Sequence, residues 1–235
     1  MTSPAGLVLA AGGSRRLGQP KQLLELDGEA LLRRTVRIAV EAGCGRVVVV
    51  LGAGAEALRL QVAGLPAEVV VNAEWEQGMG GSIRAGLEAL GLDAGRVDGG
   101  RADGGRADAG GVGGVRVDAG GFYAGRFDAF GRDVPSSVLI LVCDQPRLTV
   151  GMVRALILDF GEAEGDITAS SYKGVRGVPA IFGRNVFGAL LGLTGDEGAR
   201  KILSDVRWKV SAVEFAGGEV DIDLPSDLGL LQKEV

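Results

Sequence analysis

Leu7-Val8-Leu9-Ala10-Ala11-Gly12-Gly13 is a short apolar run that ends in small residues and glycine. It predicts a buried strand that enters a tight loop. Val, Leu and Ile runs and helical patterns then alternate, which is typical of a parallel sheet covered on both faces. We therefore predict an α/β, Rossmann-like fold with a mainly parallel sheet and helices on both faces. The early elements are a helix at 31–42 that ends at Gly43, strands at 46–52 and 68–72, and helices at 55–65 and 82–90.

The alternation stops between about residues 91 and 132, where Gly, Asp, Arg and Ala repeat. This segment has little apolar surface to bury, so we expect a mobile surface insertion within a single domain spanning 1–235. A calcium-binding glycine/aspartate repeat fits poorly, because arginines lie between the aspartates and the spacing is irregular. The pattern then resumes, with strands expected at 138–143, 167–172, 180–182, 210–215 and 220–223, and helices at 150–159, 186–193, 197–204 and 226–232, the last capped by Ser226.

Composition narrows the possible chemistry of this 235-residue chain. Its net charge of −5 argues against broad binding to nucleic acid or anionic membranes, and no run is long enough to span a bilayer. We therefore expect a cytoplasmic protein. Cys44 and Cys143 lie beside apolar runs and are expected to be buried thiols. Without histidine the chain can form no Cys/His metal site and lacks the commonest general base, whereas nucleotidyl transfer depends mainly on positioning and charge neutralisation.

The loop after the first strand, Leu9 to Lys21, has the composition of an anion-binding loop. Its small residues allow backbone amides to approach an anionic group, and Arg16 and Lys21 add positive charge. It matches neither G-x-x-x-x-G-K-[ST] nor G-x-G-x-x-G, so the two commonest nucleotide fingerprints are excluded. Farther along, Asp144 follows the 138–143 strand, at the edge where open α/β sheets bind ligands. Asp144 could coordinate a divalent cation there, or it could simply form a turn before Pro146.

Several segments, taken in order, resemble the molybdenum cofactor cytidylyltransferase group of the MobA-like nucleotidyltransferase family. Leu9–Lys21 is similar to L-A-A-G-x-S-x-R-M-G-x-x-K, with Leu17 in place of Met. Asn72–Gly86 is similar to N-x-x-W-x-x-G-M-x-x-S-[LI]-x-x-G. Cys143–Pro146 contains the family's D-x-P. The segment 221–228 resembles D-I-D-T-P-E-D-L, with Leu224 in place of Thr, and 177–182 and 193–200 resemble G-x-P-x-x-F and L-x-G-D-x-G-A-R.

The resemblance assigns candidate roles to residues of this chain. It implies that Mg²⁺ is held by Asp144 and Asp223, with Arg16 and Lys21 as further catalytic residues. Asp221 is a weaker candidate, because in a strand it would face away from Asp223. The nucleotide is expected to contact Leu9, Ala10, Ala11, Gly12, Gly13, Ser14, Arg16, Lys21, Asn72, Gly78 and Ser82. The second substrate is expected to contact Gln145, Pro146, Gly177, Pro179, Asp196, Gly198 and Arg200.

The implied reaction transfers CMP from CTP to the phosphate of molybdenum-bound molybdopterin and releases pyrophosphate. The implied partners are CTP or GTP, the pterin, and molybdoenzyme apoproteins or their chaperones. Ala11 stands where GTP-using relatives have Gly, which favours CTP over the larger base. Val178 stands where many relatives have His, so another small phosphorylated substrate stays open. The alternatives to a cytidylyltransferase are a guanylyltransferase, a non-catalytic cofactor-binding chaperone and an oxidoreductase of the same fold.

Overall fold

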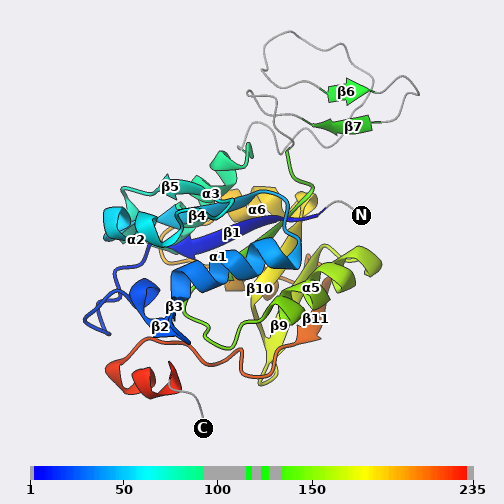
Figure 1. Cartoon of the computed structure of the whole chain (residues 1–235). Helices are drawn as coiled ribbons and strands as arrows, with labels where there is room; N and C mark the ends of the chain where they lie inside the picture. Colours follow the sequence, from blue (N-terminus) through cyan, green and yellow to red (C-terminus); the bar gives the residue numbers. More distant parts are fainter. Residues whose placement is uncertain (1–2, 93–114, 118–122, 127–133, 232–235) are drawn as a thin grey trace.

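The computed structural model describes residues 3–92, 115–117, 123–126 and 134–231 of the chain. Its main sheet has seven strands in the order β11-β9-β10-β8-β1-β4-β5 (Figure 1). Pairing is parallel except for β10, which runs antiparallel to both of its neighbours, so the predicted mainly parallel sheet is confirmed. The strands are β1 (Ala5–Ala10), β4 (Val47–Leu51), β5 (Glu68–Val71), β8 (Ser137–Val142), β9 (Ile167–Tyr172), β10 (Val175–Gly183) and β11 (Val210–Glu214).

Helices cover both faces of this sheet because side chains alternate along the central strands. Leu7 and Leu9 of β1 join one buried cluster, which includes side chains of α3 (Met79–Ala89), α6 (Phe187–Leu191) and α7 (Arg200–Leu203). Val8 and Ala10 join the opposite cluster with α1 (Leu31–Ala42), α2 (Ala55–Gln61) and α5 (Val150–Glu162). The strands therefore form the central layer, and their ends are free to carry a site.

Most element predictions are confirmed, some with shifted ends. Helix α1 has its predicted bounds, and Gly43 ends it in the left-handed conformation with φ +99°. Helix α3 begins three residues before Ser82, and α7 begins only at Arg200. A short pairing of β2 (Glu25–Leu26) with β3 (Glu29–Ala30) was not predicted, because strands of two residues carry no periodic pattern.

The predicted strand at 220–223 is wrong. After β11 the chain leaves the edge of the sheet (Figure 1), and in the part of the chain that the structure describes this segment pairs with no strand. Instead, the Ile222 amide donates a single hydrogen bond of 3.0 Å to the Asp144 carbonyl. The final helix is the 3-10 helix η4 (Pro225–Leu231). Ser226, predicted to cap this helix, lies inside it, and its hydroxyl donates a 3.2 Å hydrogen bond to Asp227 Oδ1. Asp227 Oδ2 accepts the amides of Asp223 and Leu224, which precede the helix.

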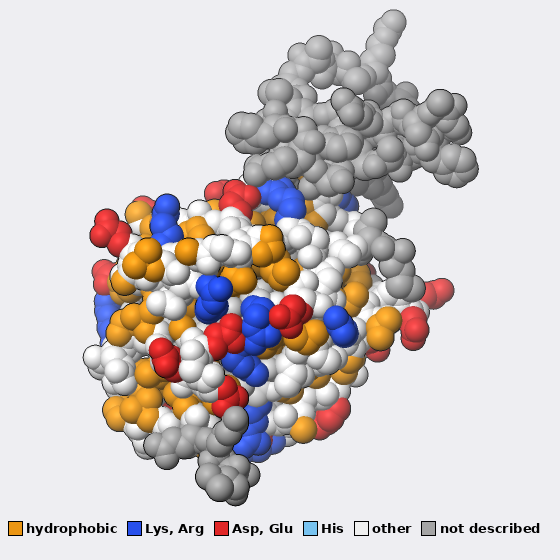
Figure 2. Space-filling view, in the orientation of Figure 1, with side chains coloured by type: hydrophobic (Ala, Val, Ile, Leu, Met, Phe, Trp, Pro, Cys, Tyr) orange, Lys and Arg blue, Asp and Glu red, His pale blue; other side chains and the backbone are white. Residues whose placement is uncertain are grey.

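Within the predicted insertion at 91–132 the structure describes residues 91–92, β6 (Val115–Val117) and β7 (Tyr123–Arg126). The strands β6 and β7 pair antiparallel in a separate two-stranded sheet. The rest of the predicted insertion lies outside the described residues. On the face seen in Figure 2, acidic and basic side chains are intermingled near the middle of the molecule. No helix within the described ranges is long and apolar enough to cross a membrane.

Candidate functional site

A cavity of about 620 Å³ lies beside the loop that follows β1, and we call it the loop cavity. Almost every residue predicted to contact the nucleotide lines it. Asn72 does not: its Nδ2 donates a 3.1 Å hydrogen bond to the hydroxyl of Ser82, so it orients a lining residue instead. The predicted residues that line the cavity are Leu9, Ala10, Ala11, Gly12, Gly13, Ser14, Arg16, Lys21, Gly78 and Ser82.

Two glycines allow the close approaches that shape the loop cavity. A Cβ on Gly13 would lie 2.8 Å from the ring of Trp75, so the loop packs directly on the indole. Gly78 has φ +113°, and a Cβ there would meet the backbone of Gly195 at 2.2 Å. Substituting Gly13 would therefore move the loop away from Trp75, and substituting Gly78 would move the start of α3 away from Gly195.

Lys21 joins the two carboxylates that were predicted to bind metal. Its ammonium lies 2.5 Å from Asp144 Oδ2 and 3.0 Å from Asp223 Oδ1. Burial by itself would lower the pKa of Lys21, but attraction from the two aspartates outweighs it and raises that pKa above the ordinary 10.5. Lys21 is therefore an ammonium ion held at the end of β8. Arg16 approaches from the solvent side and pairs with Asp223 Oδ2 at 2.8 Å.

The segment that carries Asp223 brings a third carboxylate to the site. Asp221, which was predicted to face away from Asp223, lines a cavity together with Asp144, and Asp223 is not among the residues that line that cavity. Burial raises the pKa of Asp221 to about 6, with repulsion from Asp144 and Asp223 acting in the same direction. The backbone here is held by Asp227, whose Oδ2 accepts the amides of Asp223 at 3.0 Å and Leu224 at 2.8 Å.

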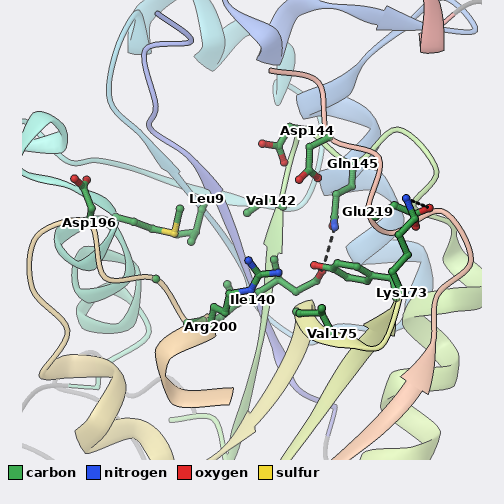
Figure 3. Close-up of a pocket in the computed structure, with 17 residues that line it drawn as sticks. Leu9, Ile140, Val142, Asp144, Gln145, Lys173, Val175, Asp196, Arg200 and Glu219 are labelled. Carbon is green, nitrogen blue, oxygen red and sulfur yellow. Dashed lines mark hydrogen bonds and ion pairs between the residues drawn. The ribbon is translucent and has the colours of Figure 1, made fainter. Parts of the chain in front are cut away.

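A second cavity, of about 560 Å³, lies against β10, and we call it the β10 cavity. In Figure 3, Asp144 and Arg200 lie on opposite walls, with apolar side chains from the central strands between them. Of the residues predicted to contact the second substrate, Gln145, Gly177, Asp196, Gly198 and Arg200 line this cavity. Pro146 and Pro179 are not among the residues that line it.

The walls of the β10 cavity combine an apolar floor with charged edges. Val178, the residue at which the sequence departs from the motif it resembles, lies on the lining. Gln145 is 3% exposed, and its Nε2 donates to the carbonyls of Val178 at 3.1 Å and Gly218 at 2.9 Å. Tyr172 was not predicted; Gly177 makes room for it, because a Cβ there would lie 1.9 Å from its hydroxyl.

The two cavities meet at the end of β8. Five residues line both of them, and Asp144 is the charged residue among them that pairs with Lys21. A phosphate group at this junction would be within reach of ligands held in either cavity. The shared residues are Leu9, Met79, Val142, Asp144 and Asp196.

The carboxylates fit a hard divalent cation. Asp144 Oδ1 is buried and has no hydrogen-bond partner in the described part of the chain, so one acceptor oxygen stays available. The described residues contain no group of three or more His, Cys, Asp or Glu side chains that could hold a metal alone. Asp144 and Asp223 would therefore form an incomplete set of ligands, to which phosphate oxygens and water could be added.

Sequence reasoning missed residues that support the loop cavity. Arg15 forms an ion pair with Glu76, and both residues line the cavity; its guanidinium also lies 5.7 Å from the centre of the Trp75 ring. Gln22 is 1% exposed and hydrogen-bonds to the loop from behind. No local pattern distinguishes such residues from solvated surface, except that Gln22 directly follows Lys21.

Comparisons with known proteins agree with this architecture. A model of the MobA-like NTP transferase domain matches residues 6–212. A protein of Paenarthrobacter nicotinovorans named "Nicotine blue oxidoreductase" is 28% identical over 229 residues, which cover 92% of this chain and 91% of the relative. An Opitutus terrae protein named "Probable molybdenum cofactor guanylyltransferase" is 54% identical over 46 residues, which cover 20% of this chain and 23% of that protein.

Solved structures show the same fold. The crystal structure of Rv0371c from Mycobacterium tuberculosis H37Rv has a TM-score of 0.69 and 26% identity, with 100% of both chains covered. A second crystal structure of Rv0371c, in complex with manganese, has a TM-score of 0.68 and 24% identity, also with 100% of both chains covered.

Proposed function

Because the chain belongs to the MobA-like NTP transferase domain family, we propose that it transfers CMP from CTP to the phosphate of molybdenum-bound molybdopterin and releases pyrophosphate. The observation that carries this proposal is the junction of the two cavities at Asp144. A nucleotide in the loop cavity and a phosphorylated acceptor in the β10 cavity would meet there, which is the arrangement that direct transfer between two bound substrates needs.

In this proposal the triphosphate lies against the loop amides, and Arg16 and Lys21 offset the charge that develops on the departing pyrophosphate. Asp144 and Asp223 would hold Mg²⁺, which would supply charge neutralisation. The acceptor phosphate is already ionised, so no side chain has to remove a proton. This chemistry suits a chain without histidine.

The choice of CTP rests on Ala11, which is 6% exposed and lines the loop cavity. Its Cβ occupies space that a glycine would leave free, so a pyrimidine fits more easily than guanine. The choice of the pterin as second substrate is based on the β10 cavity. Its apolar floor suits a flat ring, and its Arg200 suits a phosphate. Because Val178 departs from the motif that the sequence resembles, a different phosphorylated acceptor is the alternative second substrate.

Purified protein should be incubated with Mg²⁺, molybdenum-bound molybdopterin and each nucleoside triphosphate in turn, and pyrophosphate should be measured. We expect release with CTP and none when the pterin is omitted. Release with GTP alone would overturn the base assignment. Release with CTP and a different phosphorylated acceptor, but not with the pterin, would overturn the second substrate.

Two experimental outcomes would favour a function other than nucleotidyl transfer. Binding of nucleotide and pterin without pyrophosphate release would favour a non-catalytic cofactor-binding chaperone. One relative is named an oxidoreductase, so the same protein should also be mixed with NADH or NADPH and a quinoid dye. Oxidation of the dinucleotide together with no pyrophosphate release would favour a redox role.

A further inference from the structure

In the loop after β1, four backbone carbonyls are hydrogen-bonded within the protein, whereas the backbone N–H groups of residues 12–16 donate to no acceptor in the part of the chain that the structure describes. The carbonyls of Ala10 and Gly12 accept from Gln22 Nε2 at 3.0 and 2.7 Å. The Ala11 carbonyl accepts from the amide of Ala53 at 3.0 Å. The Ser14 carbonyl accepts from two amides later in the same turn, those of residues 17 and 18, each at 3.1 Å. These four carbonyls are therefore all bound to the protein.

The loop amides are arranged in the opposite way. Within the described ranges, the N–H groups of residues 12–16 donate to no protein acceptor. All five residues line the loop cavity. Consecutive amides without internal partners beside a cavity form a concave site for an anion. The loop thus has carbonyls that are hydrogen-bonded to the protein and N–H groups that are free to bind a ligand.

This arrangement of bound carbonyls and free N–H groups depends on the side chain of Gln22. It is 1% exposed, so its amide has no water as an alternative partner. One nitrogen binds two of the four carbonyls, and its Oε1 lies 3.4 Å from the Ser14 hydroxyl, which in turn accepts the Lys21 amide at 3.1 Å. Because Lys21 and Gln22 are neighbours in the short helix η1 (Lys21–Leu23), one reaches the aspartates while the other supports the loop from behind.

We infer that Gln22 is a positioning residue for the triphosphate: by holding the carbonyls of Ala10 and Gly12, it keeps the amides of residues 12–16 turned toward the loop cavity. Without its donor, a carbonyl left unpaired would rotate toward water or into the cavity and present a negative dipole to phosphate. The inference rests on the proposed function in that it takes the triphosphate as the ligand of this loop.

Two variants test this role. Gln22→Met keeps the length of the side chain and removes both polar groups, whereas Gln22→Glu keeps an acceptor and loses the donor. Gln19→Met is the matched control, because Gln19 is an exposed glutamine of the same loop. For each protein, calorimetry should give the Kd of Mg²⁺-bound inorganic triphosphate and of CTP. Hydrogen exchange should follow the amides of residues 12–16, and thermal unfolding should show that each variant folds.

We expect both Gln22 variants to bind triphosphate about tenfold more weakly, which corresponds to about 1.4 kcal/mol, while the control stays within twofold of the parent protein. The exchange pattern of the loop amides should change in the same two variants. In the transfer assay the KM for the nucleotide should rise, while the KM for the second substrate stays unchanged, a split that general loosening of the fold would not produce.

Equal triphosphate binding by Gln22→Met and Gln19→Met would overturn the inference, as would failure of the parent protein to bind triphosphate at all. If Gln22→Met does not fold, unchanged binding by Gln22→Glu overturns it in the same way. Triphosphate binding that depends on Gln22, without pyrophosphate release from any nucleotide, would overturn the transferase proposal but support the role of Gln22.

Discussion

Replacing Lys21 should strengthen metal binding in the absence of nucleotide, although it removes a residue that we propose takes part in turnover. In the structure the Lys21 ammonium lies between Asp144 and Asp223, at 2.5 and 3.0 Å, where a divalent cation would also have to bind. A metal ion must therefore displace the ammonium, unless nucleotide phosphates have already drawn it away. Lys21→Met keeps the aliphatic chain, removes this competitor and leaves the two carboxylates without their internal cation.

The size of the effect follows from the contacts that are lost. A hydrogen bond to a charged group contributes about 1.5–3 kcal/mol. Asp223 is 38% exposed and the displaced ammonium regains water, so we count one of the two contacts rather than both. Mn²⁺ should then bind to the nucleotide-free Lys21→Met variant about 10- to 150-fold more tightly than to the parent protein.

Titration of free Mn²⁺ by electron paramagnetic resonance measures this directly. Lys173→Met is the matched control: it removes the same charge from a lysine that lines the β10 cavity and pairs with Glu219 at 3.4 Å, away from the two aspartates. We expect little change there. Pyrophosphate release by Lys21→Met should fall about 100-fold or more, because one stabilising charge is lost. Unchanged or weaker Mn²⁺ binding by Lys21→Met would refute the competition.

Other predictions test the surroundings of these contacts. Asp144→Asn should lower the rate of pyrophosphate release about 100-fold or more with an unchanged circular dichroism spectrum; activity near that of the parent protein would rule out its proposed role. Asp227→Ala removes the acceptor of the Asp223 amide, so the Mg²⁺ concentration for half-maximal rate should rise about fivefold at nearly constant kcat, and an unchanged Mg²⁺ requirement would contradict this. Hydrogen bonds from Arg37 lower the pKa of Glu29 below its ordinary 4.5, so the ionised carboxylate stabilises the fold at pH 7, and this contribution is lost as the pH falls from 4.5 through the lowered value. Glu29→Gln should therefore reduce the free energy of unfolding in urea by about 0.5–1 kcal/mol at pH 7 and by little near pH 2.5; an equal loss at both pH values would count against this reasoning.

The elements that sequence predicted well are those whose signals are local. The apolar stripe of α1 and the glycine at its end lie within one short segment, and the predicted bounds agree with the structure. The family also followed from local motifs, since the loop after β1 and the segment around Asp144 are each contiguous. The strand predicted at 220–223 failed because a strand needs a neighbour to pair with, which a short segment of sequence does not reveal.

Alternation along the chain was thus enough to determine the α/β fold, and the composition of one loop predicted an anion-binding turn after the first strand. The nucleotidyltransferase family followed from the resemblance of several contiguous motifs, and a family model that matches residues 6–212 confirms it. Only the tertiary structure decided that Lys21 lies between Asp144 and Asp223, which are 123 and 202 residues farther along the chain. It also decided that Asp221 faces the β10 cavity and that Gln22 supports the loop from behind. Backbone preferences act over a few residues, whereas the meeting of distant side chains depends on strand order and on how the final segment crosses the sheet.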